Sequence, residues 1–196
     1  MFTGIIETMG RVQKIEKEGN NIHYFLSSSI THELKIDQSV SHNGVCLTVV
    51  GIQDDVYQVT AIQETLQKTN LKTLEVNDSM NLERCTAANG RFDGHIVQGH
   101  VDTTAVCTSI EDQQGSFVYT FSYASHPQFM TVEKGSIAVN GISLTVINSH
   151  ESQFSVAIIP YTLENTNLKE VKINSTVNLE FDIIGKYVAK IMASRV

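Results

Sequence analysis

An internal repeat restricts the fold of this chain more than any other feature. The segment HNGVCLTVV (42–50) returns as VNGISLTVI (139–147), an offset of 97 residues (139 − 42). The same offset aligns TLQKTNL (65–71) with TLENTNL (162–168). Two copies are too few for a solenoid, and each copy is long enough to form a small domain. The chain is therefore expected to fold as two similar domains.

The ends of the two copies set the domain boundaries. Near the N-terminus the offset becomes 95 residues (99 − 4), which aligns Gly4 with Gly99. The stretch TAANGRFDG (86–94) is rich in Gly, Asn, Asp and Ala, a composition typical of a linker. We expect one domain over residues 1–86, a second over 95–183, and a separate C-terminal segment over 184–196.

Within each copy, short runs rich in aromatic and β-branched residues predict strands. HYFLSSS, VYQVTAI, FVYTFSY and FSVAIIP are such runs, and Gly, Asn and Asp separate them. Pro160 is expected to close a strand or to lie on an edge. Because closure removes exposed strand edges, a small antiparallel barrel in each copy is the simplest prediction, and the chain is of the all-β class.

The C-terminal segment DIIGKYVAKIMASRV differs from the rest. Its apolar residues recur at helical spacing, which predicts a helix with an apolar stripe. Two alternatives explain the stripe: it packs on its own barrel, or it associates with the same helix of other subunits. The apolar residues of the stripe are Ile184, Tyr187, Val188, Ile191 and Met192.

Charge and cysteine content exclude several classes of protein. The net charge of −7 argues against a general nucleic-acid surface, which needs clustered Lys and Arg. No apolar run approaches the ~20 residues of a membrane helix, and the start MFTGIIE lacks the basic region of a signal peptide. Three cysteines without CxxC spacing fit a reducing cytosol, and they favour neither disulfides nor a zinc site.

The repeated strand presents its polar residues on one face. In NGVCLTVV, Val45, Leu47 and Val49 share a face, while Cys46 and Thr48 point the opposite way, and NGISLTVI repeats this pattern. We expect the apolar sets to fill the barrels and the polar pairs to face outward. The outer face is either solvated or forms two related pockets for a planar ligand.

The copies differ at positions that carry polar or ionisable groups in the second copy. Such differences are expected of two equivalent pockets of which one holds acid–base groups. Each also has a structural explanation: a surface turn for the lysine, a structural role for the histidine, a helix cap for the aspartate. The substitutions are Lys134 for Asp37, Ser143 for Cys46, His100 for Ile5, and Asp182 for Cys85.

Six segments in the same order resemble the riboflavin synthase family over essentially the whole chain: MFTGIIE, HNGVCLTV, ETLQKTNL, GHIVQGHVDTTA, NGISLTV and IPYTLENTNL. The resemblance implies two six-stranded antiparallel Greek-key barrels followed by a C-terminal helix. It also implies a cytoplasmic homotrimer that uses no metal or organic cofactor, and an association with lumazine synthase.

The resemblance further implies a transferase that dismutates two molecules of 6,7-dimethyl-8-ribityllumazine. One molecule donates a four-carbon unit to the other, which gives riboflavin and 5-amino-6-(D-ribitylamino)uracil. The active site would lie where the N-terminal barrel of one subunit faces the C-terminal barrel of a neighbour, with two substrate molecules per site. Two related pockets that differ at their reactive groups suit a reaction between two identical molecules.

The resemblance assigns site residues by position. In the C-terminal barrel, His100, Ser143 and Asp182 would serve proton transfer and hold the nucleophile, and Lys134 would supply positive charge near the anion. Cys46 is expected to contact the ligand and not to act as a covalent nucleophile. The substrate-binding positions in the first copy are Thr3, Gly4, Ile5, Ile6, Ser39, Cys46, Leu47, Thr48, Thr60, Ala61, Ile62, Gln63, Glu64 and Thr65. Those in the second copy are Val101, Asp102, Leu144, Thr145, Ala157, Ile158, Ile159, Pro160, Tyr161 and Thr162.

Thr65 and Thr162 are expected to hold the ribityl chain. Tyr161 departs from the family, which often has an acidic or imidazole side chain there, so the backbone is expected to supply the contacts at this position. Two rival interpretations are an antenna protein that holds a lumazine or flavin without turnover, and the flavin-binding barrel of a reductase. The polar residues of the C-terminal barrel favour the enzyme over the antenna protein. The absence of a GxGxxG motif argues against the reductase.

Overall fold

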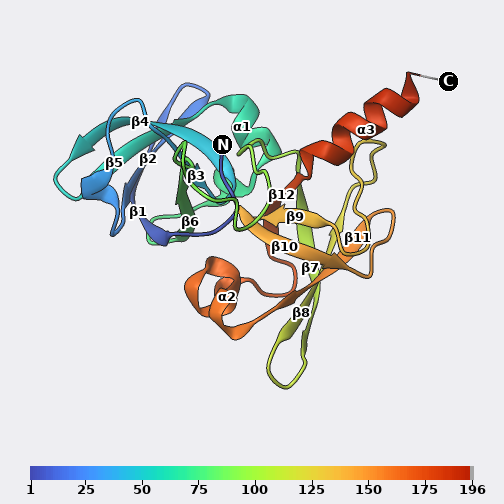
Figure 1. The fold of residues 1–196 in the computed structure, drawn as a ribbon. Helices are drawn as coiled ribbons and strands as arrows, with labels where there is room; N and C mark the ends of the chain where they lie inside the picture. Colours follow the sequence, from blue (N-terminus) through green and yellow to red (C-terminus); the bar gives the residue numbers. More distant parts are fainter. Residues whose placement is uncertain (195–196) are drawn as a thin grey trace.

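A computed structural model describes residues 1–194, which form two closed six-stranded β-barrels followed by one helix (Figure 1). The N-terminal barrel consists of β1 (Thr8–Glu18), β2 (Asn21–Ser27), β3 (Ser39–His42), β4 (Val45–Gln53), β5 (Val56–Ala61) and β6 (Ser79–Arg84). The C-terminal barrel consists of β7 (Thr103–Asp112), β8 (Phe117–Tyr123), β9 (Ser136–Val139), β10 (Ile142–Ile147), β11 (Gln153–Ile158) and β12 (Thr176–Phe181).

The two barrels have the same topology. The first closes in the order β1-β2-β5-β4-β3-β6, and the second in the equivalent order β7-β8-β11-β10-β9-β12, with every pair of neighbours antiparallel. A short helix precedes the last strand of each barrel. These helices are α1 (Gln63–Lys68) and α2 (Pro160–Asn165), each followed by a 3₁₀ turn, η2 (Asn70–Thr73) or η3 (Asn167–Glu170), and η1 (Thr31–Glu33) lies after β2. The all-β prediction is confirmed, and Pro160 begins α2 directly after β11.

Each barrel has its own apolar core, filled by alternate strand residues. Val45, Leu47 and Val49 of β4 are buried in the first core, whereas Thr48 is exposed and Cys46 is half-buried. The equivalent strand β10 repeats this pattern in the second core. The prediction of an apolar inner face and a polar outer face is therefore confirmed for both strands.

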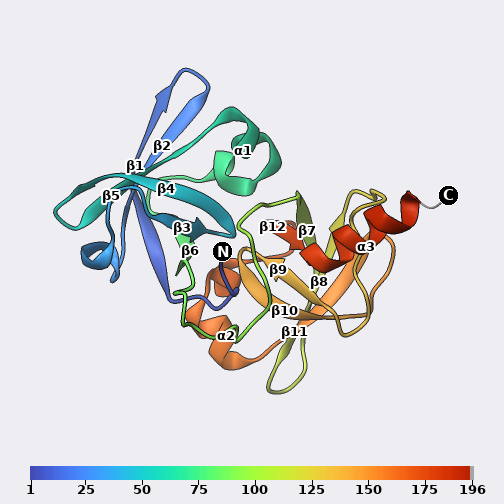
Figure 2. The ribbon, with the colours of Figure 1, turned by 45° about the horizontal axis from the view of Figure 1, so that its top comes forward.

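The barrels meet at two Asn-Gly hairpin turns. Asn43 and Asn140 have φ of 48° and 46°, and the following Gly44 and Gly141 have φ of 81° and 79°, as two-residue hairpins with this sequence require. A Cβ on Gly44 would lie 2.8 Å from Gly141 N, so the two turns are in close contact. Figure 2 shows the barrels side by side, with the N-terminus between them.

Buried asparagines join the barrels around these turns. The Asn81 amide donates to Asn140 O (3.0 Å) and to Asn167 Oδ1 (2.8 Å), and the Asn178 amide donates to Asn43 O (2.8 Å). Asn81 and Asn178 are equivalent in the repeat, so the contacts are related by approximate twofold symmetry. Because all of these side chains are buried and hydrogen-bonded, the interface fixes the relative orientation of the barrels.

The C-terminal helix α3 (Ile183–Ala193) extends away from the C-terminal barrel (Figures 1 and 2). The side chains of the apolar stripe are between 52 and 64% exposed, so within residues 1–194 the stripe does not pack on its own barrel. The predicted helix reached Val196, and residues 195–196 lie outside the described part. Within residues 1–194, no helix has the length and apolar character that crossing a membrane requires.

Candidate active site

Each barrel carries a pocket at the same place on its surface. In the N-terminal barrel the start of β4, helix α1 and residues 99–101 line a pocket of about 230 Å³. In the C-terminal barrel the start of β10, helix α2 and residues 4–9 line a pocket of about 430 Å³. The repeat relates the pockets residue by residue, and Cys46 of the first corresponds to Ser143 of the second.

One wall of each pocket comes from the chain segment that leads into the other barrel. The Cys46 N–H donates to Gly99 O (2.8 Å), and the Ser143 N–H donates to Gly4 O (2.8 Å). Both glycines have positive φ, 78° for Gly4 and 80° for Gly99. A Cβ on Gly4 would lie 2.6 Å from the Cβ of Ser143, and a Cβ on Gly99 would lie 2.6 Å from the Cβ of Cys46. The segments before β1 and β7 are therefore exchanged between the barrels.

This exchange corrects the predicted grouping of the polar residues. His100 follows Gly99 and lines the pocket of Cys46 and Thr65, not that of Ser143. The position equivalent to His100 in the Ser143 pocket is held by Ile5. The prediction assigned His100 to the second barrel because it belongs to the second copy of the repeat. It is wrong within one chain because residues 98–101 cross to the first barrel.

Ser143 has a histidine partner that the sequence analysis missed. The Oγ of Ser143 lies 2.7 Å from Nδ1 of His95, and the backbone N–H of His95 donates to Thr3 O (3.1 Å). Burial lowers the pKa of His95, while the negative charge of Asp182 raises it. His100 lines the Cys46 pocket, and His95 is hydrogen-bonded to Ser143 of the other pocket, so ionisable groups are not confined to the second pocket as expected.

Asp182 and Lys134 have visible structural roles. The Asp182 carboxylate caps α3 by accepting from the Ile184 N–H (2.9 Å), and its charge also acts on His95. Lys134 occupies a turn at φ 63°, its side chain is 71% exposed, and its Nζ lies 3.8 Å from Glu133. The structure therefore brings Ser143, His95 and Asp182 together and leaves Lys134 at the surface of this chain.

The Cys46 pocket contains groups suited to holding a polar ligand. Desolvation raises the pKa of the Cys46 thiol, which opposes the thiolate form that a nucleophile needs. Thr65 and Glu64 line the same pocket from α1, and Val101 lines it from the exchanged segment. In the Ser143 pocket, Thr162 and Tyr161 of α2 occupy the positions equivalent to Thr65 and Glu64.

The remaining predicted positions lie outside the two pockets. Asp102 accepts from the Phe181 N–H (2.9 Å) and pairs with Lys186 Nζ (2.6 Å), so its carboxylate serves structure. Thr60 is hydrogen-bonded to His23 Nδ1 (2.8 Å). The side chains buried inside the barrels are Leu47, Ala61, Leu144 and Ile158. Those exposed on the outer faces are Thr48, Ile62, Gln63, Thr145, Ala157, Ile159 and Pro160.

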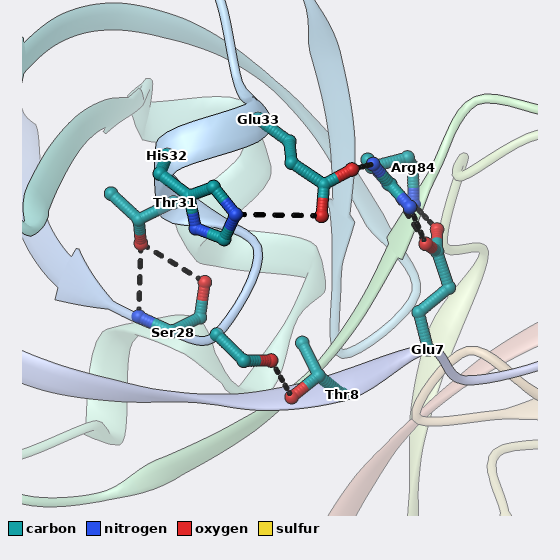
Figure 3. Close-up of polar contacts among 8 residues, drawn as sticks. Glu7, Thr8, Ser28, Thr31, His32, Glu33 and Arg84 are labelled. Carbon is teal, nitrogen blue, oxygen red and sulfur yellow. Dashed lines mark hydrogen bonds and ion pairs between the residues drawn. The ribbon is translucent and has the colours of Figure 1, made fainter.

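A third pocket, of about 590 Å³, lies beside the linker and includes Thr3 and Ser39. Its Arg84 is already occupied, because Nε donates to Glu7 (2.8 Å) and an NH group donates to Glu33 (2.6 Å), as Figure 3 shows. This network fixes the segment leading into β1 and engages Arg84, while Arg91, the other arginine of the pocket, lies 3.7 Å from Asp93. Within residues 1–194, no group of His, Cys, Asp and Glu side chains is placed to hold a metal ion.

Comparison with known proteins identifies the two halves. A model of the lumazine binding domain matches residues 3–85 and 98–182. A riboflavin synthase of Actinobacillus pleuropneumoniae is 40% identical over 196 residues, 100% of this chain and 91% of that protein. A riboflavin synthase of Bacillus subtilis (strain 168) is 38% identical over 193 residues, 98% of this chain and 90% of that protein.

A solved structure shares the fold. The structure of LumP complexed with 6,7-dimethyl-8-(1'-D-ribityl) lumazine has a TM-score of 0.84 and 22% identity, covering 92% of this chain and 99% of that chain. At this identity the likeness concerns the architecture of the two barrels. With two matched domains and full-length relatives at 38–40% identity, the chain belongs to the riboflavin synthase family.

Proposed function

We propose that this chain is a riboflavin synthase that converts two molecules of 6,7-dimethyl-8-ribityllumazine into riboflavin and 5-amino-6-(D-ribitylamino)uracil. The observation that carries the proposal is the pair of equivalent pockets with different polar groups. Two related pockets bind two copies of one heterocycle, and unequal groups let one copy donate and the other accept. The relatives that match the whole chain are named riboflavin synthase.

In this proposal, Ser143 and His95 carry out proton transfer at the C-terminal pocket. The 7-methyl group of the lumazine is acidic, because its anion delocalises into the ring. Burial lowers the pKa of His95, so the imidazole is neutral near pH 7 and can accept a proton through Ser143 Oγ. General acid–base catalysis of this kind contributes about 10²–10⁴-fold.

In the N-terminal pocket, His100 and Cys46 surround the second lumazine, and Thr65 binds its ribityl chain. The half-buried thiol with a raised pKa suits a neutral contact with the ring. Holding the two rings face to face supplies a large part of the rate enhancement, since alignment of two reactants is worth about 7–11 kcal/mol in ideal cases. Leu144, Thr145 and Ile159 contribute mainly through their backbone.

The complete site forms between chains. In one chain His100 and Ser143 lie in different pockets, so a site with both needs the N-terminal pocket of one subunit beside the C-terminal pocket of another. The exposed apolar stripe of α3 supports a homotrimer, because such a surface is usually covered. Lys134 would join the site only in that assembly. A cytoplasmic location fits the three free cysteines, and association with lumazine synthase remains a prediction from the family.

The test is to supply 6,7-dimethyl-8-ribityllumazine alone and to follow riboflavin by absorbance and chromatography. One riboflavin and one aminouracil for every two lumazines consumed is the expected result. Tight binding of lumazine without any riboflavin would contradict the proposal. It would favour an antenna protein, which holds lumazine without turnover.

A further inference from the structure

Two buried carboxylates that the proposed chemistry does not use lie at equivalent positions of the two barrels. Glu83 and Glu180 are the last residues but one of β6 and β12, and they are only 4% and 3% exposed. Their positions differ by the repeat offset of 97 residues (180 − 83). A buried carboxylate is costly unless it is hydrogen-bonded, so the groups around each one need an explanation.

Glu180 accepts three consecutive backbone N–H groups. Its Oε1 accepts from Gln98 (2.6 Å), and its Oε2 accepts from Gly99 (2.9 Å) and His100 (2.8 Å). Hydrogen bonds to an ionised acceptor are about twice as strong as neutral ones. The carboxylate therefore fixes the backbone that leads to His100.

Glu83 holds the equivalent segment in the same way. Its Oε1 accepts from the Thr3 N–H (2.6 Å) and from the Thr3 hydroxyl (2.8 Å), and its Oε2 accepts from the Gly4 N–H (2.9 Å). Burial raises the pKa of both carboxyls, while the donated hydrogen bonds lower it. Since every donor faces a carboxylate oxygen, the ionised form suits this arrangement.

Each segment held in this way forms a wall of the pocket on the other barrel. Gly99 accepts from Cys46 N–H, and the next residue, His100, enters the Cys46 pocket. Gly4 accepts from Ser143 N–H, and the next residue, Ile5, enters the Ser143 pocket. A carboxylate at the end of one barrel thus determines what the neighbouring pocket contains.

We propose that Glu180 is a positioning residue for the N-terminal pocket, where it places His100 against Cys46, and that Glu83 does the same for Ile5 in the C-terminal pocket. The value of this positioning for turnover rests on the proposed function. The geometric claim does not, because it concerns which pocket loses its wall when one carboxylate is changed. The two glutamates are matched controls for each other.

The experiment follows alkylation of Cys46 by iodoacetamide in a Cys85→Ser background, which removes the exposed thiol while Cys107 stays buried. In Glu180→Gln, an amide NH₂ replaces one oxygen and faces N–H donors. We expect Cys46 to react at least about tenfold faster, because losing charge-assisted hydrogen bonds frees the Gly99 wall. Glu83→Gln should leave the rate within about twofold, because its segment contacts Ser143. Glu180→Asp keeps the charge, so its rate of Cys46 alkylation should fall between those of the unaltered chain and Glu180→Gln.

Equal acceleration in Glu180→Gln and Glu83→Gln, or no acceleration in either, would overturn the proposal. If Glu180→Gln does not fold, as judged by circular dichroism, amide hydrogen exchange on the unaltered chain gives the answer. The Gly99 and His100 amides should then be protected like those of β6 and β12, and exchange as fast as in linker residues 88–91 would contradict the proposal. Neither readout needs lumazine, so a chain that fails to make riboflavin but shows the selective Cys46 effect would refute only the proposed function.

With turnover, the variants give a second, independent comparison. Glu180→Gln should raise KM for lumazine, since the Cys46 pocket loses a wall, and Glu180→Asp should recover part of this loss. A purely structural carboxylate would lower the amount of folded protein and leave KM unchanged. An unchanged KM, together with an unchanged rate of Cys46 alkylation in folded Glu180→Gln, would refute the positioning role of Glu180 and leave the proposed function standing.

Discussion

Ser143 Oγ lies 2.7 Å from His95 Nδ1, whereas the equivalent Cys46 in the other pocket has Ser39 as its side-chain hydrogen-bond partner. The repeat offset of 95 near the N-terminus maps His95 ahead of Met1, so the repeat pairs this histidine with no residue of the sequence. The pair therefore distinguishes the C-terminal pocket chemically, and it is the first place to test.

Ser143→Ala and His95→Asn should each lower kcat for riboflavin formation by about 10²-fold or more. Alanine removes the hydroxyl, and asparagine can keep a hydrogen bond to Ser143 but cannot accept a proton. Lumazine affinity should change much less. The double variant should lose little more than either single variant, because the two groups act as one unit. Steady-state kinetics and fluorescence titration measure both effects, and full multiplicative loss in the double variant would contradict a shared role.

Asp182→Asn separates the capping role of this residue from its charge. Asparagine caps helices as well as aspartate does, so α3 should stay folded. The negative charge of Asp182 raises the pKa of His95, so its removal should lower this pKa further. The acid limb of the pH–turnover profile should therefore move to lower pH. An NMR titration of His95 checks the direction, and a shift to higher pH would show that Asp182 acts in another way.

The repeat made the fold predictable from the sequence. Because the motif around Cys46 alternates apolar and polar residues, its duplication at Ser143 fixed the inner and outer faces of both barrels. Gly, Asn and Asp separate the predicted strands in the sequence, but the contact between the Asn43-Gly44 and Asn140-Gly141 turns depends on how the barrels dock. Asn81 and Asn178 look like ordinary strand residues in the sequence, and only the docked structure shows them joining the barrels.

The site was only partly predictable, because chain exchange is invisible to a repeat comparison. A repeat assigns His100 to the copy in which it stands, whereas Glu180 and Cys46 hold its segment against the other barrel. His95 was missed because it has no aligned partner. Its signal was present in GHIVQGH, which contains both histidines, but the sequence does not say that His95 pairs with Ser143 while His100 lines the Cys46 pocket.

His42 should make the fold sensitive to acid. It is fully buried, with Nδ1 2.9 Å from Val40 O and Nε2 2.9 Å from Tyr57 Oη, so the imidazole is neutral. Burial lowers the pKa of His42 from 6.5 to about 4. The unfolded chain takes up a proton near pH 6.5 and the folded chain does not. The contribution of His42 to the free energy of unfolding is therefore complete above pH 6.5. It decreases by up to about 3 kcal/mol as the pH falls towards 4.

Urea unfolding between pH 7 and pH 4 measures this loss, and His42→Gln is the control. Glutamine does not titrate, so the variant should be less stable at pH 7 but show a weaker decline on acidification. The difference between the two slopes isolates His42 from other groups such as His95, whose lowered pKa acts in the same direction. Identical slopes would show that His42 does not bear this linkage.

Asn81→Ala and Asn178→Ala should destabilise the chain by similar amounts, about 2 kcal/mol or more each. Each substitution leaves buried backbone groups without partners, Asn140 O in one case and Asn43 O in the other. The near equality follows from the approximate twofold symmetry of the interface. Urea unfolding provides the measurement. A loss below about 0.5 kcal/mol, as at an ordinary surface position, would contradict a role in joining the barrels.

We propose that two unequal pockets on different chains meet to serve one reaction. This proposal is tested by refolding two impaired variants, His100→Ala and Ser143→Ala, together. A site between an N-terminal pocket with His100 and a neighbour's C-terminal pocket with Ser143 is then restored, in up to about a quarter of random pairings in a ring. We expect riboflavin synthesis to return in the mixture at about that fraction. Turnover that stays at the level of the separate variants, although the chains have exchanged, would contradict a site shared between chains and would show that it lies within one chain.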